Sequence, residues 1–123
     1  MFEAGRAAAE GEASGYGNEA SVSELRAASL EEVRVGKPKL VELDGTRVVL
    51  MRVGDAVYAL GDVCSHQGGP LSEGKQTGAR LTCPWHGWTY DVRTGRCAFP
   101  SRGAAVPSYP ARIDAGQIWV ELP

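Results

Sequence analysis

Two short stretches decide how this chain folds: CSHQGGPLSEG (residues 64–74) and CPWHGWTYD (residues 83–91). The first places His66 two residues after Cys64, and the second places His86 three residues after Cys83. These are the two histidines of the chain, and they accompany two of its three cysteines. Thiolate and imidazole groups gathered in this way predict a metal site formed by Cys64, His66, Cys83 and His86.

The identity of the metal follows from how the ligands are distributed between the two stretches. Two cysteines and two histidines also suit a tetrahedral zinc ion, and a zinc-bound interaction module is one alternative. Common zinc fingers pair cysteine with cysteine and histidine with histidine, whereas each stretch here supplies one of each. A [2Fe–2S] cluster in which two histidines replace two cysteines on one iron needs Cys-x-His, a gap and Cys-x-x-His. The sequence has this order, with sixteen residues in the gap.

Residues 64–95 resemble the cluster-binding region of Rieske ferredoxins and Rieske oxygenases, because both stretches match that family in ligands, glycines and order. The resemblance extends through the flanking strands to residues 21–122. It implies an all-β Rieske fold, in which short antiparallel strands form stacked sheets with two cluster-binding loops at one end. It also implies that Cys64 and Cys83 bind one iron of a [2Fe–2S] cluster, while His66 and His86 bind the other.

The resemblance is to the low-potential, oxygenase-associated type of Rieske ferredoxin. High-potential respiratory members link the two loops by a disulfide, at positions where this chain has Gly69 and Trp85. They also have a serine that donates to the cluster where this chain has Trp88, although Tyr90 matches their tyrosine. The remaining cysteine, Cys97, is expected to be a free structural thiol.

The same resemblance implies an electron carrier that is not itself an enzyme. We expect it to carry one electron from an NAD(P)H-dependent flavoprotein reductase to a terminal oxygenase. A catalytic oxygenase would need a further iron held by two histidines and a carboxylate, and both histidines are already assigned. The alternative is the small Rieske subunit of a nitrite-reductase-like or other redox enzyme complex.

Composition excludes other classes of function. The 123 residues carry a net charge of -2, which gives no basic surface for nucleic acid. No apolar run approaches the ~20 residues that a membrane helix needs. Residues 1–20 are rich in Ala, Gly and Glu, lack the apolar core of a secretory signal and predict a flexible N-terminal tail. Residues 21–123 are then the Rieske domain, and we expect a cytoplasmic protein.

Turn-bounded runs of apolar and β-branched residues predict strands at 39–43, 47–53, 56–60, 80–83, 88–91, 97–99, 112–114 and 117–122. Hairpin turns are predicted at 44–45, 54–55, 94–95 and 115–116. Both alternating sets of residues in 47–53 are largely apolar, which predicts a strand covered on both faces. Ser29 to Glu32 predicts a capping box for one helical turn, and three prolines predict an irregular loop over residues 100–110.

Overall fold

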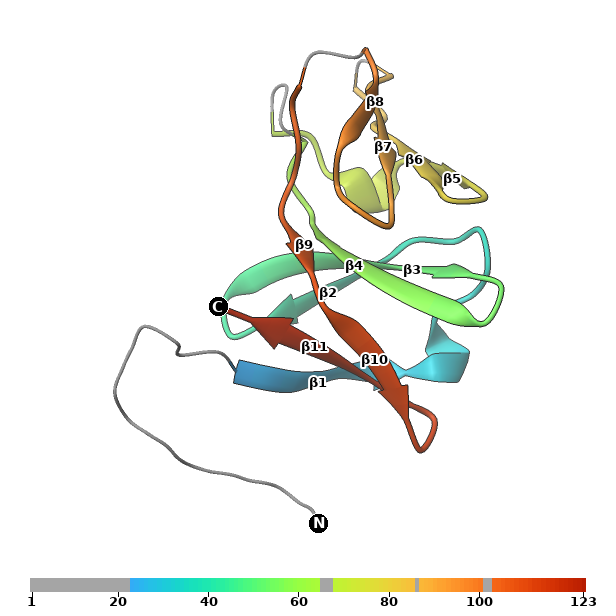
Figure 1. The fold of residues 1–123 in the computed structure, drawn as a ribbon, viewed down its shortest axis with the longest axis vertical. Coiled ribbons are helices and arrows are strands. Elements are labelled where there is room, and N and C mark those ends of the chain that lie inside the picture. The colour runs from blue at the N-terminus through green and yellow to red at the C-terminus, as the bar shows by residue number, and fades with distance from the viewer. Residues whose placement is uncertain (1–22, 65–67, 86, 101–102) are drawn as a thin grey trace.

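The computed structural model describes residues 23–64, 68–85, 87–100 and 103–123. Within these ranges the chain forms eleven strands and two one-turn 3-10 helices (Figure 1). The strands pair antiparallel in three sheets, so the predicted all-β fold is confirmed. None of the described helices has the length and apolar character needed to span a membrane.

The first sheet combines strands from the beginning and the end of the described chain, and the third sheet is formed by four consecutive strands. The first sheet has the order β1 (Ser23–Ser29), β11 (Gln117–Leu122) and β10 (Ala111–Asp114). The second has the order β2 (Lys39–Leu43), β3 (Thr46–Val53), β4 (Ala56–Gly61) and β9 (Ser108–Tyr109). The third has the order β5 (Lys75–Thr77), β6 (Arg80–Thr82), β7 (Thr89–Asp91) and β8 (Cys97–Phe99). The 3-10 helices are η2 (Leu30–Glu32) and η3 (Leu71–Glu73).

Backbone conformation explains why two of the predicted turns are tight. In the turn between β2 and β3, Asp44 and Gly45 have φ values of 52° and 82°. Ala115 and Gly116, between β10 and β11, have φ values of 53° and 76°. Two successive left-handed residues match the right-handed twist of the flanking strands, which is the geometry that a two-residue hairpin requires.

Strand β3 lies between two apolar cores. Val48 and Leu50 face a core shared with β1, β4 and β11, and Val49 and Met51 face a second core shared with β4, η3, β6, β7 and β8. All four side chains are fully buried, so the prediction of a strand covered on both faces is confirmed. Burying each of them stabilises the fold by about 1.5–3 kcal/mol. The second core therefore fixes the third sheet, and the loops that enter it, against β3.

Two local predictions need correction. Ser29 Oγ lies 3.0 Å from a Glu32 carboxylate oxygen, but its side chain makes no hydrogen bond to the η2 backbone. The helical turn is confirmed and the capping box is wrong, because the two side chains bond to each other. Residues 108–109 are also not irregular: they form β9, which pairs with β4, and the prolines at 107 and 110 keep that strand short.

Strands β1 and β5 were not predicted from the sequence. The predicted tail at residues 1–20 lies outside the described residues.

Candidate metal centre

The two cysteine-bearing loops lie at the end of the molecule opposite the first sheet (Figure 1). The first cysteine loop (residues 64–70) follows β4 and ends where η3 begins. The second cysteine loop (residues 83–88) connects β6 directly to β7. Because β4 and β6 contribute to the second core, both loops start from rigid strands.

The two loops share the same backbone hydrogen bonds. The N–H of Cys64 donates to the carbonyl of Gly69 at 2.8 Å, and the N–H of Cys83 donates to the carbonyl of Trp88 at 2.7 Å. The glycine four residues after each cysteine, Gly68 or Gly87, donates its N–H back to the cysteine carbonyl at 2.8 or 3.1 Å. Both glycines have a φ of 77°, a conformation that favours glycine. Two loops of one geometry therefore present two cysteines in equivalent positions.

Both cysteine side chains are buried at the edge of the second core. Cys64 is 3% exposed and Cys83 is 2% exposed. Cys64 Sγ lies 3.2 Å from the hydroxyl of Tyr90, a fully buried residue of β7. If Cys64 is a thiolate, the hydroxyl is the donor in this contact, and such charge-assisted hydrogen bonds are stronger than neutral ones. The expected donor role of Tyr90 therefore has a geometric basis.

The two loops contact each other at Gly69. A Cβ atom added to Gly69 would lie 3.0 Å from Cys83 Sγ and 2.9 Å from Cδ2 of Trp85. Any larger residue would push the loops apart, so this position requires glycine. Gly69 and Trp85, the two positions expected to correspond to the disulfide of respiratory members, therefore lie against each other.

The two predicted histidine ligands, His66 and His86, lie outside the described residues. In sequence, each falls between the cysteine and the left-handed glycine of its loop. The donor set in the sequence of the two loops, with one cysteine and one histidine each, has the chemistry that a [2Fe–2S] cluster with mixed ligands requires. Among the described residues, no group of three or more His, Cys, Asp or Glu side chains gathers at another place as a rival metal site.

Cys97 lies in the same core but has different partners. Its Sγ lies 3.2 Å from the carbonyl oxygen of Pro100 and 3.4 Å from that of Phe99, and it forms no disulfide. Burial raises the pKa of the Cys97 thiol, and the neighbouring Cys64 raises it further. A protonated thiol that donates to backbone carbonyls matches the structural role expected for Cys97.

Sequence reasoning missed one buried charge beside the centre. Asp62, two residues before Cys64, is 1% exposed and forms an ion pair with Arg47 at 3.1 Å. The signal in the sequence was weak, because Asp62 follows Gly61 at the end of a predicted strand and resembles an ordinary turn residue.

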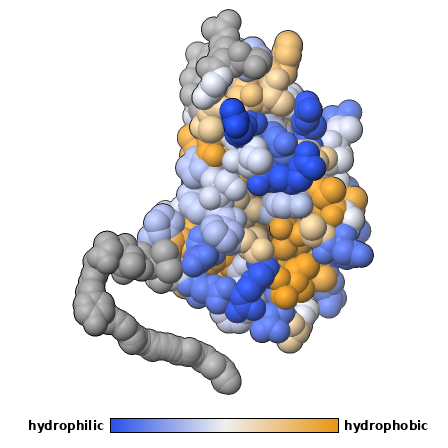
Figure 2. Space-filling model, viewed as in Figure 1, coloured by the Kyte–Doolittle hydropathy of each residue, from blue (hydrophilic) through white to orange (hydrophobic). Residues whose placement is uncertain are grey.

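Three large apolar side chains next to the cysteine loops are exposed: Val63 is 50% exposed, Trp85 54% and Phe99 67%. Val63 precedes Cys64, Trp85 belongs to the second cysteine loop, and Phe99 pairs with the first residue of β7. We call these three residues the apolar rim. On the face shown in Figure 2, apolar surface is visible at the end of the molecule where β8 lies.

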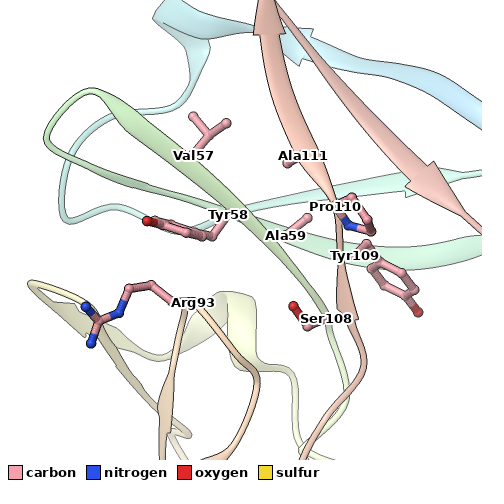
Figure 3. A pocket seen from close by; sticks show the side chains of 8 residues that line it. All are labelled: Val57, Tyr58, Ala59, Arg93, Ser108, Tyr109, Pro110 and Ala111. Carbon is pink, nitrogen blue, oxygen red and sulfur yellow. The ribbon is translucent and has the colours of Figure 1, made fainter.

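A pocket of about 300 Å³ lies away from the cysteine loops, between β4, β9 and β10 (Figure 3). Arg93, from the turn between β7 and β8, also lines it. Arg93 is already paired with Asp91, at 3.2 and 3.3 Å, and none of the residues that line the pocket belongs to a cysteine loop. The pocket is therefore separate from the candidate metal centre.

Comparison with known proteins identifies the family. The family model of the Rieske [2Fe-2S] domain matches residues 23–110, which include both cysteine loops, the second and third sheets, and strand β1 of the first sheet. The chain belongs to the Rieske [2Fe-2S] domain family. Membership of this family implies that the chain carries an iron–sulfur cluster.

A ferredoxin component, a demethylase and an oxidoreductase are similar in sequence to this chain. The chain is 28% identical over 98 residues to the ferredoxin component of the naphthalene 1,2-dioxygenase system of Pseudomonas aeruginosa, covering 80% of this chain and 94% of that protein. It is 35% identical over 96 residues to the methylxanthine N1-demethylase NdmA of Pseudomonas putida, covering 69% of this chain. The chain spans 26% of the length of NdmA and 13% of the length of the oxidoreductase NdmD of the same species.

Solved Rieske structures match most of the fold. The ferredoxin of carbazole 1,9a-dioxygenase from Nocardioides aromaticivorans IC177 has a TM-score of 0.75 and 34% identity, covering 80% of this chain and 96% of that one. A complex of reduced oxygenase and oxidised ferredoxin in carbazole 1,9a-dioxygenase matches with a TM-score of 0.74 and 28% identity, covering 79% and 91%. A protein described as an NADH-dependent nitrite reductase small subunit from Mycobacterium tuberculosis also reaches 0.74 at 28% identity, covering 84% and 97%.

Proposed function

We propose that this chain is an electron carrier with a Rieske-type [2Fe–2S] cluster bound by Cys64, His66, Cys83 and His86. The observation that carries the proposal is the pair of cysteine loops with matched hydrogen bonds and buried cysteines. When bound, the cluster accepts and releases one electron at a time. The protein transports this electron and does not itself transform a substrate.

Each part of the centre has a role in this proposal. Cys64 and Cys83 supply two thiolates, and His66 and His86 supply two neutral imidazoles in place of two further thiolates. Fewer negative ligands make reduction easier than in a cluster with four cysteines. The Tyr90 hydroxyl donates to Cys64 Sγ, and the surrounding core keeps water away from both sulfur atoms.

The proposed partners are an NAD(P)H-dependent flavoprotein reductase as the donor and a terminal oxygenase as the acceptor. Similarity to two dioxygenase ferredoxins over nearly their whole length supports this choice. The apolar rim also supports it, because exposed apolar and aromatic side chains beside the cysteine loops are typical of the core of a protein–protein interface. Because such a reductase draws on the NAD(P)H pool of the cell, we also propose that the protein acts in the cytoplasm.

An electron-transfer assay tests this function. Under anaerobic conditions, NADH, a purified ferredoxin reductase and cytochrome c are combined with and without the cluster-loaded protein. We expect cytochrome c reduction to depend on the protein and to be lost in a Cys83→Ser variant. The chemically reduced protein alone, given oxygen and an aromatic substrate, should form no oxidised product. Product formation by the chain alone, or no electron transfer from any reductase, would refute the proposal.

The nitrite reductase small subunit supports a second candidate, because its fold matches as well as that of the ferredoxins. In that case the chain would be a fixed subunit of a larger enzyme. Affinity purification from the native host distinguishes the two: a free carrier elutes alone or with weakly bound partners. Stable co-purification with a large subunit, together with NADH-dependent nitrite consumption, would favour the second candidate.

A further inference from the structure

A buried carboxylate joins the two ends of the first cysteine loop. Asp62 accepts hydrogen bonds from the backbone N–H of Ser72 at 2.5 Å and from its hydroxyl at 3.0 Å. Arg47 donates to the same carboxylate at 3.1 Å. The N–H of Asp62 in turn donates to the carbonyl of Arg47 at 3.1 Å. The side chain of Asp62, which directly follows β4, therefore links β3 to helix η3.

Asp62 and its partner Ser72 flank the first cysteine loop. Asp62 stands two residues before Cys64, and Ser72 lies in η3, directly after the first cysteine loop. The backbone hydrogen bonds inside the loop join Cys64, Gly68 and Gly69 to one another, and the contact of Cys64 with Tyr90 ties the first residue of the loop to β7. Asp62 adds a second tie, because it links the residues that flank the beginning and the end of the loop.

The charges of the pair are unequally exposed. The Asp62 side chain is fully buried, whereas the Arg47 side chain is 49% exposed. A buried charge acts on its neighbours through a less polar medium than a charge that water solvates. The carboxylate therefore opposes the arrival of an electron at the neighbouring centre, and Arg47 offsets part of that effect.

Resting on the proposed electron-carrier function, we propose that Asp62 is a positioning residue that closes the first cysteine loop. We further propose that the Asp62–Arg47 pair sets how readily the centre held by Cys64 is reduced. Removing the carboxylate charge makes reduction easier, and removing the guanidinium charge makes it harder.

Two substitutions with opposite electrostatic signs test the second part. Asp62→Asn keeps the shape and removes the negative charge, and it should raise the equilibrium constant for reduction by about threefold or more. Arg47→Gln leaves the carboxylate uncompensated and should lower that constant by a similar factor. Both variants lose the same ion pair, so a purely structural role would move both constants in one direction. Spectroelectrochemical titration of the cluster-loaded proteins at neutral pH and about 0.15 M salt measures them.

Charge removal elsewhere provides the controls. Arg52→Gln removes a charge from the other end of β3, and Asp114→Asn removes one from the last residue of β10, in the first sheet. Neither should change the equilibrium constant. Shifts of equal sign in Asp62→Asn and Arg47→Gln, or no shift in either, would overturn the electrostatic role. If Asp62→Asn does not retain its cluster, an unchanged constant in Arg47→Gln is sufficient to overturn it.

Hydrogen exchange tests the positioning role without an electron-transfer assay. In the full-length protein as purified, Asp62→Ala should speed exchange of the backbone amides of Cys64 and Ser72 by about tenfold or more, because the loop ends are released. Amides in β11 should keep their rates. Unchanged exchange at Cys64 and Ser72 would overturn the positioning role, and this result is independent of whether the protein carries electrons.

Discussion

Tyr90 connects the buried core to the candidate centre through a single hydrogen bond. Its hydroxyl lies 3.2 Å from Cys64 Sγ, and its ring is fully buried in the second core. Reduction makes the cysteine sulfur more negative, so a donor at this place stabilises the reduced state more than the oxidised state.

Tyr90→Phe should therefore lower the reduction potential by about 40 mV, equivalent to about 1 kcal/mol of lost hydrogen-bond energy. Film voltammetry of the loaded protein measures the change. Tyr58→Phe is the matched control, because Tyr58 packs against the same core from β4 and should leave the potential unaltered. An unchanged or higher potential in Tyr90→Phe would show that the hydroxyl does not stabilise the reduced sulfur.

Cys97 provides a second prediction at the residue scale. Cys97→Ser replaces a thiol that contacts two backbone carbonyls by a hydroxyl that can make the same contacts. The visible spectrum and the iron content should match the unmodified protein, because Cys97 is not one of the proposed ligands. Loss of the cluster in this variant, with the fold intact by circular dichroism, would contradict the assigned ligand set.

The sequence located some site residues and not others for a physical reason. Cys64 and Cys83 stand out because metal ligands need particular side chains at short, fixed spacings. Asp62 acts through Arg47 and Ser72, which lie 15 and 10 residues away. Contacts over such distances depend on how β3, β4 and η3 pack, and no local pattern records them.

At the scale of elements, the first sheet is held across its width by an ion pair. Arg112 on β10 donates to the carboxylate of Glu24 on β1, two strands away, with one contact of 2.9 Å. The hydrogen bond from Arg112 lowers the pKa of Glu24 below its ordinary value. A carboxylate with a lowered folded-state pKa stabilises the fold above its unfolded pKa, and this contribution disappears as the pH falls through the folded-state value.

Glu24→Gln should therefore lower the unfolding temperature by about 1–2 °C at neutral pH, since the pair is partly exposed and screened by water. The difference between variant and unmodified protein should vanish in acid, once Glu24 is protonated. Thermal unfolding followed by circular dichroism across this range checks it, with Glu42→Gln on β2 as the control. A difference that persists at the acid end would mean that the pair does not act through charge.

Strands were predicted correctly where residues typical of turns marked their ends. The hairpins at 44–45 and 115–116 could be predicted because each contains a glycine, and few other residues tolerate positive φ. β1 and β5 escaped notice because SELRAAS and KQT contain few β-branched or aromatic residues. β1 is a strand because it pairs with β11, and β5 because it pairs with β6, so tertiary contacts decide both.

At the scale of the whole molecule, the match to the family model begins after the predicted tail, at residue 23. We propose that residues 1–20 are a tail that the domain of residues 21–123 does not need. Deleting them should preserve the cluster and change the unfolding temperature by less than about 2 °C. Differential scanning calorimetry and iron analysis test this, and loss of the cluster on deletion would contradict the division.

We propose above all that two matched loops hold one [2Fe–2S] cluster through two cysteines and two histidines. Pulsed electron paramagnetic resonance of the chemically reduced protein, prepared with ¹⁵N-labelled histidine, tests it most directly. We predict a signal of one unpaired electron per chain, coupled to the nitrogens of two histidines. A signal without histidine coupling, or a colourless protein that contains zinc and gives no signal, would contradict the account.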